Sequence, residues 1–180
     1  MVRQSPLIVP VRDLIGHPGQ MRELTLEFTA PEGYGEAVAV VPEGEPIELT
    51  LRLESVHEGI LASGTITATA HAQCVRCLEP VEEELSAEFQ ELFAYSGQEG
   101  YDYQVVDETI DLDQVVRDHL VLELPFQPVC SEDCPGLDPE TGQKRPEGWQ
   151  PPALDDIDPR WAALEKLVQD RDETTGEAPR

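Results

Sequence analysis

The chain has 180 residues, of which 39% are hydrophobic and 6% aromatic, and its 12 Lys and Arg against 37 Asp and Glu give a formal net charge of −25. This length allows one domain with a buried core and a tail, but hardly two full domains. The charge argues against broad, sequence-independent RNA binding, because affinity for a phosphate backbone comes from Lys and Arg.

Apolar residues near the start of the chain predict two β-strands. Residues 7–15 are apolar with a Pro-containing start and predict an opening strand. Leu24, Leu26 and Phe28 alternate with polar residues and predict a second strand. The apolar run at the amino terminus is interrupted by Pro6, Pro10 and Asp13 and has no small-residue cleavage site after it, so it does not predict a signal peptide.

Three longer stretches alternate between apolar and polar residues, with Glu83 and Glu91 as exceptions on the apolar face of the last one. They are PIELTLRLE (46–54), ILASGTITATAH (60–71) and VEEELSAEFQELF (81–93). The period of two is typical of half-buried strands, and the short connections predict adjacent antiparallel pairs. The last connection contains Cys74-x-x-Cys77, which places this motif in a hairpin turn.

A helix is predicted over IDLDQVVRDHLVLELP, with Asp111 as its cap, Gln114 three residues later and Pro125 at its end. Its apolar stripe contains Leu112, Val115, Val116 and His119. Together with the strands, this helix predicts an α+β fold in which an antiparallel sheet of hairpins is covered by one or two helices and followed by an irregular acidic C-terminal segment.

The predicted organisation is one domain over residues 1–136 and an irregular linker over 137–157. A C-terminal helix follows over 158–170, capped by Asp158 with Pro159 at its first position, and a disordered tail over 171–180. The apolar face of that helix contains Trp161, Leu164, Leu167 and Val168. No apolar run is long enough for a membrane span, so we expect a soluble, cytoplasmic protein in which cysteines are metal ligands or buried thiols rather than disulfides.

Four cysteines form two closely spaced pairs, Cys74-x-x-Cys77 and Cys130-x-x-x-Cys134. Both pairs lie in turn-forming sequence, and two thiolates from one turn can reach the same tetrahedral ion. If the predicted helix returns the chain to the hairpin end of the sheet, the pairs predict one structural zinc site. The alternative is a set of inert buried thiols.

Other chemistry has less support in the sequence. A redox role for Cys74 and Cys77 requires a helix amino terminus, whereas a glutamate-rich strand follows them. His71 is a conceivable substitute ligand but falls on the polar face of a strand, and His119 is more typical of a partly buried histidine. There is no phosphate loop, HExxH motif or nucleophile elbow, so the sequence does not predict an enzyme.

The combination CVRCLEPVEEELSAEFQELF, IDLDQVVRDHLVLELPFQPVC and CSEDCPGL resembles the YceD family, the large ribosomal RNA subunit accumulation proteins of bacteria and plastids. The resemblance covers about Leu49–Gly142. It implies a cytoplasmic factor needed for accumulation or processing of 23S ribosomal RNA, with no established catalytic residues. Family members often carry a further CxxC where this chain has Asp138 and Thr141, so that second pair is absent here.

The leading hypothesis is therefore a non-enzymatic factor in biogenesis of the large ribosomal subunit. A basic ribosomal protein is the expected direct partner, held by an acidic sheet face that includes Glu82, Glu84 and Glu88. Two alternatives remain open, a Mg²⁺-dependent nuclease or hydrolase acting on ribosomal RNA precursors and a zinc-stapled protein-interaction adaptor. Carboxylates available to the nuclease are Asp111, Asp113, Asp155, Asp156 and Asp158.

Overall fold

The computed structural model describes residues 5–36, 38–95 and 100–149. The chain divides into two compact units, Met1–Arg145 and Pro146–Arg180, and the first contains all the elements described below. They are β1 (Ile8–Pro10), β2 (Met21–Thr29), β3 (Tyr34–Glu36), β4 (Ala39–Val41), β5 (Pro46–Ser55), β6 (Gly59–Gln73), β7 (Pro80–Ala94), β8 (Tyr103–Gln104), β9 (Thr109–Asp111) and α1 (Asp113–Glu123).

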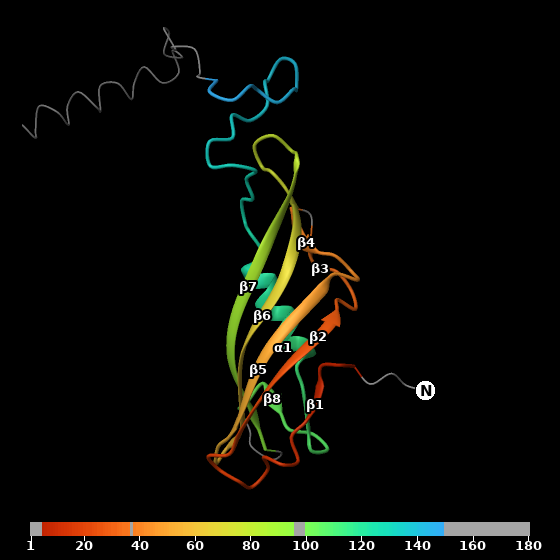
Figure 1. The fold of residues 1–180 in the computed structure, drawn as a ribbon, viewed down its shortest axis with the longest axis vertical. Coiled ribbons are helices and arrows are strands. Elements are labelled where there is room, and N and C mark those ends of the chain that lie inside the picture. Colours follow the sequence, from red (N-terminus) through yellow and green to blue (C-terminus); the bar gives the residue numbers. More distant parts are fainter. Residues whose placement is uncertain (1–4, 37, 96–99, 150–180) are drawn as a thin grey trace, which may run out of the picture. The chain divides into compact units, whose positions relative to one another are not determined.

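The long strand β6 organises the main sheet, which has seven strands (Figure 1). One edge of β6 pairs antiparallel with β5 and then, beyond it, with β4, while the other edge pairs with β7 over its whole length. β2 pairs with β5, β3 with β4, and β8 runs parallel to the end of β7. A separate two-stranded sheet joins β1 to β9.

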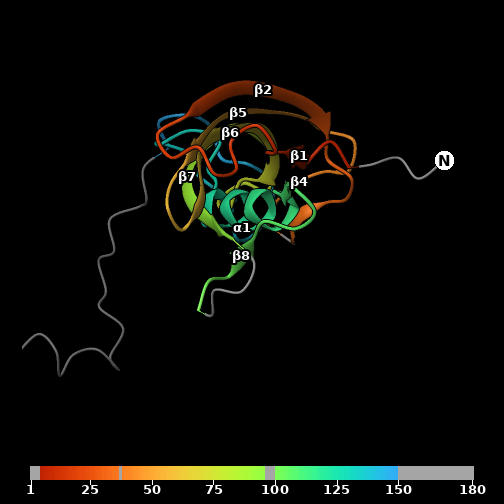
Figure 2. The same cartoon turned by 90° about the horizontal axis from the view of Figure 1, so that it is seen from below.

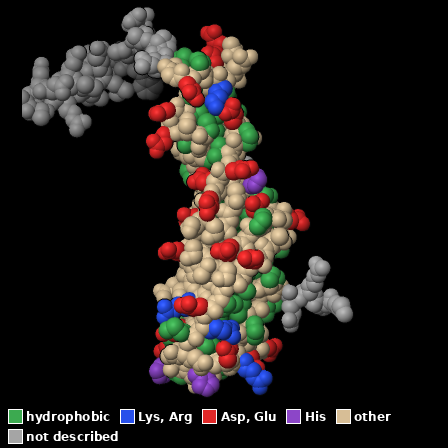
Figure 3. Space-filling view, in the orientation of Figure 1, with side chains coloured by type: hydrophobic (Ala, Val, Ile, Leu, Met, Phe, Trp, Pro, Cys, Tyr) green, Lys and Arg blue, Asp and Glu red, His purple; other side chains and the backbone are tan. Residues whose placement is uncertain are grey.

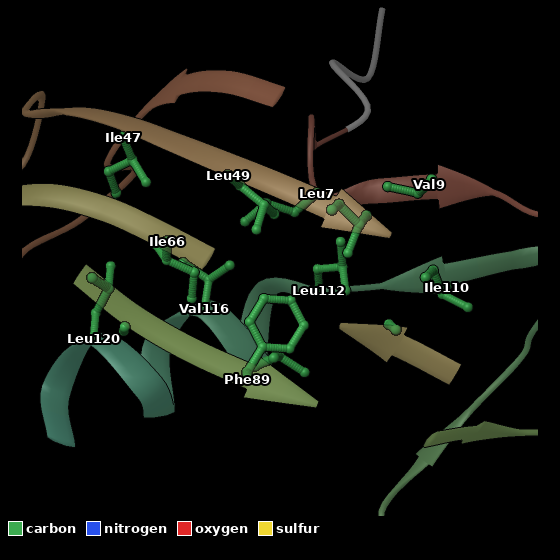
Figure 4. Packing of buried hydrophobic residues seen from close by; sticks show 14 of the residues in the cluster. Leu7, Val9, Ile47, Leu49, Ile66, Phe89, Ile110, Leu112, Val116 and Leu120 are labelled. Carbon is green, nitrogen blue, oxygen red and sulfur yellow. The ribbon is translucent and has the colours of Figure 1, made fainter. Parts of the chain in front are cut away.

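The sheet curves around α1, so that strands β2, β5, β6 and β7 form an arc on one side of the helix (Figure 2). Alternation on these strands sends one set of side chains inward, such as Ile47 and Leu49 from β5, and Ile66 from β6 (Figure 4). Val116 and Leu120 of α1 are fully buried in the same cluster. Most inward positions of β5, β6 and β7 are buried, those of β2 are half-buried, and most outward positions are polar, which explains the period of two in the sequence.

The small sheet adds a second layer of buried residues to this core. Leu7 and Val9 from the start of the chain pack near Ile110 and Leu112, just before α1 (Figure 4). Only three residues, Ile8–Pro10, form the strand β1, whereas the sequence predicted a strand over 7–15. The chain turns at Val11, whose carbonyl accepts hydrogen bonds from Leu14 and Ile15, and so buries Val11 and Leu14 without extending the strand.

The predicted α+β class is wrong, because the protein is mostly β. In the described residues, nine strands accompany one helix of 11 residues. The sheet encloses much of its core by its own curvature and by β1 and β9, so one short helix suffices to cover the inner face. The predicted helix at 158–170 and the tail at 171–180 lie outside the described residues, and the predicted boundary at 136 stays a prediction.

Helix α1 confirms the predicted helix but begins differently from the prediction. It starts at Asp113, and Leu112, not Asp111, is the residue at the N-cap position. The Asp111 carboxylate still accepts a hydrogen bond from the Asp113 backbone N–H, at 3.0 Å. Across the described part of the chain, no helix has the length and apolar character needed to cross a membrane.

Candidate metal centre and acidic sheet face

The turn between β6 and β7 presents the first cysteine pair. The turn is closed by two backbone hydrogen bonds, from the Cys74 N–H to the Glu79 carbonyl and from the Leu78 N–H to the Cys74 carbonyl. Leu78 adopts a left-handed backbone conformation, with φ of 60°. Both Cys74 and Cys77 are buried. The sequence prediction of CxxC in a hairpin turn is therefore confirmed.

The segment that follows α1 delivers the second pair to the same turn. Val75 donates its N–H to the Pro128 carbonyl, and Leu137 donates its N–H to the Arg76 carbonyl. The Arg76 guanidinium in turn donates to the Glu132 and Cys134 carbonyls at 2.8 and 3.2 Å. These bonds fasten residues on both sides of the second pair to the hairpin.

Gly136 permits the closest part of this contact. Its φ is +75°, and a Cβ atom at this position would lie 3.3 Å from the Arg76 carbonyl oxygen. An L-residue would therefore be strained by its backbone conformation and crowded by the hairpin. Glycine at this position lets the segment after Cys134 approach the turn between β6 and β7.

Four sulfur atoms consequently gather in one place. Cys74 Sγ lies 3.8 Å from Cys134 Sγ, and Cys77 Sγ lies 3.6 Å from Cys130 Sγ. All four thiols lie within 4.8 Å of one another, and all four are free cysteines. They form the only cluster of three or more potential metal-binding side chains found among the described residues.

This geometry fits a tetrahedral thiolate site. With metal–sulfur distances of about 2.3 Å, a regular tetrahedron has sulfur–sulfur separations of about 3.8 Å. Two of the separations in the cluster, 3.6 and 3.8 Å, are close to that value and far from the bond length of a disulfide. A site with four protein ligands is closed, which is typical of structural rather than catalytic metal.

Backbone amides favour a thiolate at one of the ligands. Burial raises the pKa of Cys74, but hydrogen bonds from the backbone of Cys130, Cys77 and Arg76 lower it to about 6. For Cys77, the backbone hydrogen bond involving Glu79 lowers the pKa, but burial and the neighbouring thiols outweigh it and raise the value to about 12. One member of the cluster is thus ready to bind a cation near neutral pH, and the other thiols would release their protons to solvent when a metal binds.

Lys144 adds a positive charge beside the cysteines. Its Nζ lies 3.9 Å from Cys130 Sγ and forms an ion pair with Glu79. The cation is placed there by a bridge between Leu137 and Lys144, which brings the end of the segment back to the hairpin. Sequence analysis missed Lys144, which lies in no recognised motif, and Arg76, which occupies a variable position inside Cys74-x-x-Cys77. Their signal was only the scarcity of cations in a strongly acidic chain.

The positions where the family resemblance implies a further CxxC are occupied by a hydrogen-bonded turn. The Asp138 carboxylate accepts the backbone N–H groups of Glu140 and Thr141, both at 2.9 Å. These two backbone bonds hold the pKa of Asp138 below its usual value. Gly142 donates its N–H to the Asp138 carbonyl and closes the loop. Asp138 therefore organises this loop through hydrogen bonds and is outside the cysteine cluster.

The two histidines considered in the sequence lie away from the cysteine cluster. His71 is 3.5 Å from Glu45 on the polar face of β6. His119 contacts the Phe89 ring and lies 3.4 Å from Glu91, between α1 and β7. His119 is thus the partly buried histidine that its place on the apolar stripe predicted.

The predicted partner-binding residues Glu82, Glu84 and Glu88 share one face of β7. All three are exposed, and they alternate with the buried residues Leu85, Ala87 and Phe89, so they belong to the outer face of the sheet. Along the face seen in Figure 3, red acidic side chains are spread over the sheet, whereas blue Lys and Arg side chains lie near its ends. A shallow hollow of about 360 Å³ on this face is lined by Glu84 together with Glu27 and Glu48 of neighbouring strands.

Comparison with known proteins adds a family match. The family profile described as "Large ribosomal RNA subunit accumulation protein YceD" matches residues 62–168. This range includes β6 from Ala62 onward, β7, α1 and both cysteine pairs. No solved structure gives a significant match to the chain.

Several curated proteins are similar over most of the chain. An uncharacterized protein of Mycobacterium tuberculosis is 41% identical over 178 residues, which cover 94% of this chain and 85% of that protein. An uncharacterized protein of Mycobacterium leprae is 38% identical, covering 91% of this chain and 78% of its own length. The uncharacterized protein YlbN of Bacillus subtilis is 30% identical, covering 72% of this chain and 78% of its own length.

Proposed function

The chain belongs to the YceD family, and on that premise we propose that it is a non-enzymatic factor that promotes accumulation and processing of 23S ribosomal RNA and thereby biogenesis of the large ribosomal subunit. The family match carries this proposal. It covers most of β6, all of β7, the helix and all four cysteines, so it includes the cysteine cluster and the elements that bring the four cysteines together. The family description names an effect on ribosomal RNA and no reaction.

The four cysteines support a structural zinc ion as part of the proposal. Cys74, Cys77, Cys130 and Cys134 would hold it, and thiolate ligands in a tetrahedral arrangement favour Zn²⁺ among common ions. When bound, the ion supplies a cross-link between the hairpin turn and the segment after α1. The absence of the further CxxC at Asp138 and Thr141 does not affect this ligand set.

The charge distribution supports a basic ribosomal protein as the direct partner. Glu82, Glu84 and Glu88 are exposed on the outer face of β7, in a chain with a net charge of −25. A surface of this sign attracts Lys- and Arg-rich segments and repels a phosphate backbone. Such a factor would hold the basic segment before it reaches ribosomal RNA.

A nuclease gains no specific support from the described residues. Asp111 accepts a hydrogen bond from the Asp113 backbone, which accounts for one of the proposed carboxylates by local structure. Asp111 and Asp113 belong to no group of three or more potential metal ligands within the described part of the chain. Asp155, Asp156 and Asp158 lie outside the described residues. The interaction adaptor is compatible with the leading proposal, because the adaptor's partner can be a ribosomal protein.

Depletion of the protein in its own cells tests the proposal. We expect the ratio of 23S to 16S ribosomal RNA to fall, and to recover when the wild-type chain is supplied again. An unchanged ratio after depletion contradicts a role in biogenesis. Cleavage of precursor RNA by the purified chain, dependent on Mg²⁺, would replace the non-enzymatic proposal by the nuclease.

A further inference from the structure

The outward edge of β7 is a free strand edge. β7 pairs with β6 along its whole length, but its other edge pairs only with β8, at Phe93 and Ala94. Within the described residues, no backbone group of 81–92 has a hydrogen-bond partner on that other edge. An unpaired row of N–H and C=O groups is a template for a further strand.

The residues that present these free groups can be identified from the register. The Tyr95 N–H bonds to the Glu58 carbonyl on the β6 side, whereas the Ala94 carbonyl accepts the Val105 N–H on the other side. The pairing with β6 is continuous from Gly59–Ala94 to Gln73–Pro80, so this alternation persists along β7. The free backbone groups therefore belong to the even-numbered residues, Glu82, Glu84, Ser86, Glu88, Gln90 and Leu92.

The same residues have the acidic side chains of the outer face. Glu82, Glu84, Ser86, Glu88 and Gln90 are all exposed, and β7 contains no Lys or Arg. The side chains of Glu84 and Glu88 have no ion-pair or hydrogen-bond partner among the described residues. A second copy of β7 placed along this edge would bring glutamates opposite glutamates, which is destabilising.

We propose that the free edge of β7 binds an extended Lys- or Arg-rich segment of a partner protein by strand addition, with the backbone groups of Glu84, Ser86, Glu88 and Gln90 pairing with the segment. The proposal rests on the proposed function for the nature of the partner. The free backbone groups can form hydrogen bonds with any extended chain, so they give affinity without selectivity. The glutamates on the outer face then select a segment with cationic side chains.

The opposite edge of the sheet offers a matched comparison. By the same alternation, the free edge of β2 belongs to its odd-numbered residues, including Glu23, Thr25 and Glu27, which are also exposed. β2 contains a cation, Arg22, and has fewer acidic residues than β7. It also lies outside the residues matched by the family profile. These differences favour β7 as the binding edge.

The test uses the full chain and a synthetic peptide that alternates Lys with Thr. Binding is followed by fluorescence anisotropy, and amide hydrogen exchange is read by NMR. We expect the peptide to protect the amides of Glu84, Ser86, Glu88 and Gln90, whereas their odd-numbered neighbours on β7 are already protected by β6. Protection confined to β2, or no new protection in either edge, overturns the proposal.

Proline and charge variants separate strand addition from simple attraction. Ser86→Pro removes one outward N–H but no bond to β6, so the strand is expected to fold and peptide binding to be lost. Thr25→Pro on β2 is the matched control and should leave binding unchanged. Gln90→Pro replaces Ser86→Pro if thermal melting shows that the latter variant does not fold. Equal binding by the folded proline variant and the wild type overturns strand addition.

Glu84→Lys with Glu88→Lys should weaken peptide binding by about tenfold or more, whereas Glu23→Lys with Glu27→Lys should change it little. Equal losses for both pairs would overturn the choice of edge. A ribosomal RNA fragment that protects the same amides better than the peptide also overturns the proposal. The 23S ratio after depletion is measured separately, so failure of the peptide arms with a reduced ratio removes the edge alone and leaves the proposed function standing.

Discussion

The four cysteines differ in burial although they meet at one point. Cys74, Cys77 and Cys134 are buried, whereas Cys130 is exposed and lies beside Lys144. A substitution at Cys130 therefore removes a ligand without placing a new polar group in the core. A substitution at Cys74 does both, because this side chain is fully buried.

We predict that the wild-type chain purified without chelator contains about one zinc per chain and that Cys130→Ser loses it. Cys74→Ser should also lose the metal and should lower the free energy of unfolding further, by about 1–3 kcal/mol, because its hydroxyl is buried without full hydrogen bonding. Zinc content and urea unfolding measure the two effects. Ser131→Ala is the control, since Ser131 contributes only its backbone carbonyl to the cluster's turn.

Alanine substitutions at Gly136 and Gly142 distinguish the effect of backbone strain from the effect of steric crowding. Both have positive φ, +75° and +66°, but only at Gly136 would a Cβ meet the hairpin, at the Arg76 carbonyl. We predict that Gly136→Ala weakens zinc retention against a competing chelator more than Gly142→Ala does. The expected difference in free energy of unfolding is about 1 kcal/mol. Equal effects would mean that the close approach at Arg76 has no energetic role.

At the scale of single elements, the two faces of α1 differ in how much they contribute to packing against the sheet. Leu120 is 0% exposed in the core, and Leu122, two residues later, is 81% exposed. We predict that Leu120→Ala lowers the free energy of unfolding by about 2–5 kcal/mol. Leu122→Ala, with the same chemical change on the same helix, should stay within about 0.5 kcal/mol of wild type. Urea denaturation compares the two, and equal losses would contradict the burial of Leu120.

The long elements could be predicted from the sequence, and the short ones could not. β5, β6 and β7 each contain enough alternating residues to show a period of two, and their predicted pairing is confirmed. β3, β4, β8 and β9 have three residues or fewer, too few to show any period. Without these short strands the sequence predicts the wrong fold class. The curved main sheet and the small sheet of β1 and β9 cover core residues that the α+β prediction assigns to helices.

The candidate site was predicted in composition but not in full. The spacing of Cys74, Cys77, Cys130 and Cys134 indicated one cluster, and the structure brings the four together. The resemblance that rested on the residues around them is confirmed by the family match. Lys144 reaches the cluster through a bridge with Leu137, a tertiary contact that leaves no local pattern in the sequence.

At the scale of the whole molecule, the cysteine cluster is separate from the main core. The buried residues form two groups, one around α1 and the sheet and one around Cys74, Cys77 and Cys134 with Val81, Val129 and Leu137. A loss confined to the smaller group need not unfold the larger one. A metal bound by the four cysteines would therefore act on the attachment of the segment after α1 more than on the sheet.

We predict that chelation leaves the β-sheet signal in circular dichroism largely unchanged but exposes the segment to protease. Trypsin should cleave after Lys144 faster in the chelated protein, because the bridge and the Glu79 ion pair no longer hold this part of the chain to the hairpin. Re-addition of zinc should restore the slower cleavage. Collapse of the whole β signal on chelation would contradict the separation of the two groups.

The sequence distance between the paired sulfurs has a consequence for the order of folding. Cys77 and Cys130 are 53 residues apart, and Cys74 and Cys134 are 60 apart, so the loops between them contain all of β7 and α1. A metal that joined them in an unfolded chain would oppose the entropy of closing these long loops. Once β7 has paired and α1 has docked, the sulfurs are already neighbours. Tight zinc capture would thus be a late event, and its rate would report when the fold is complete.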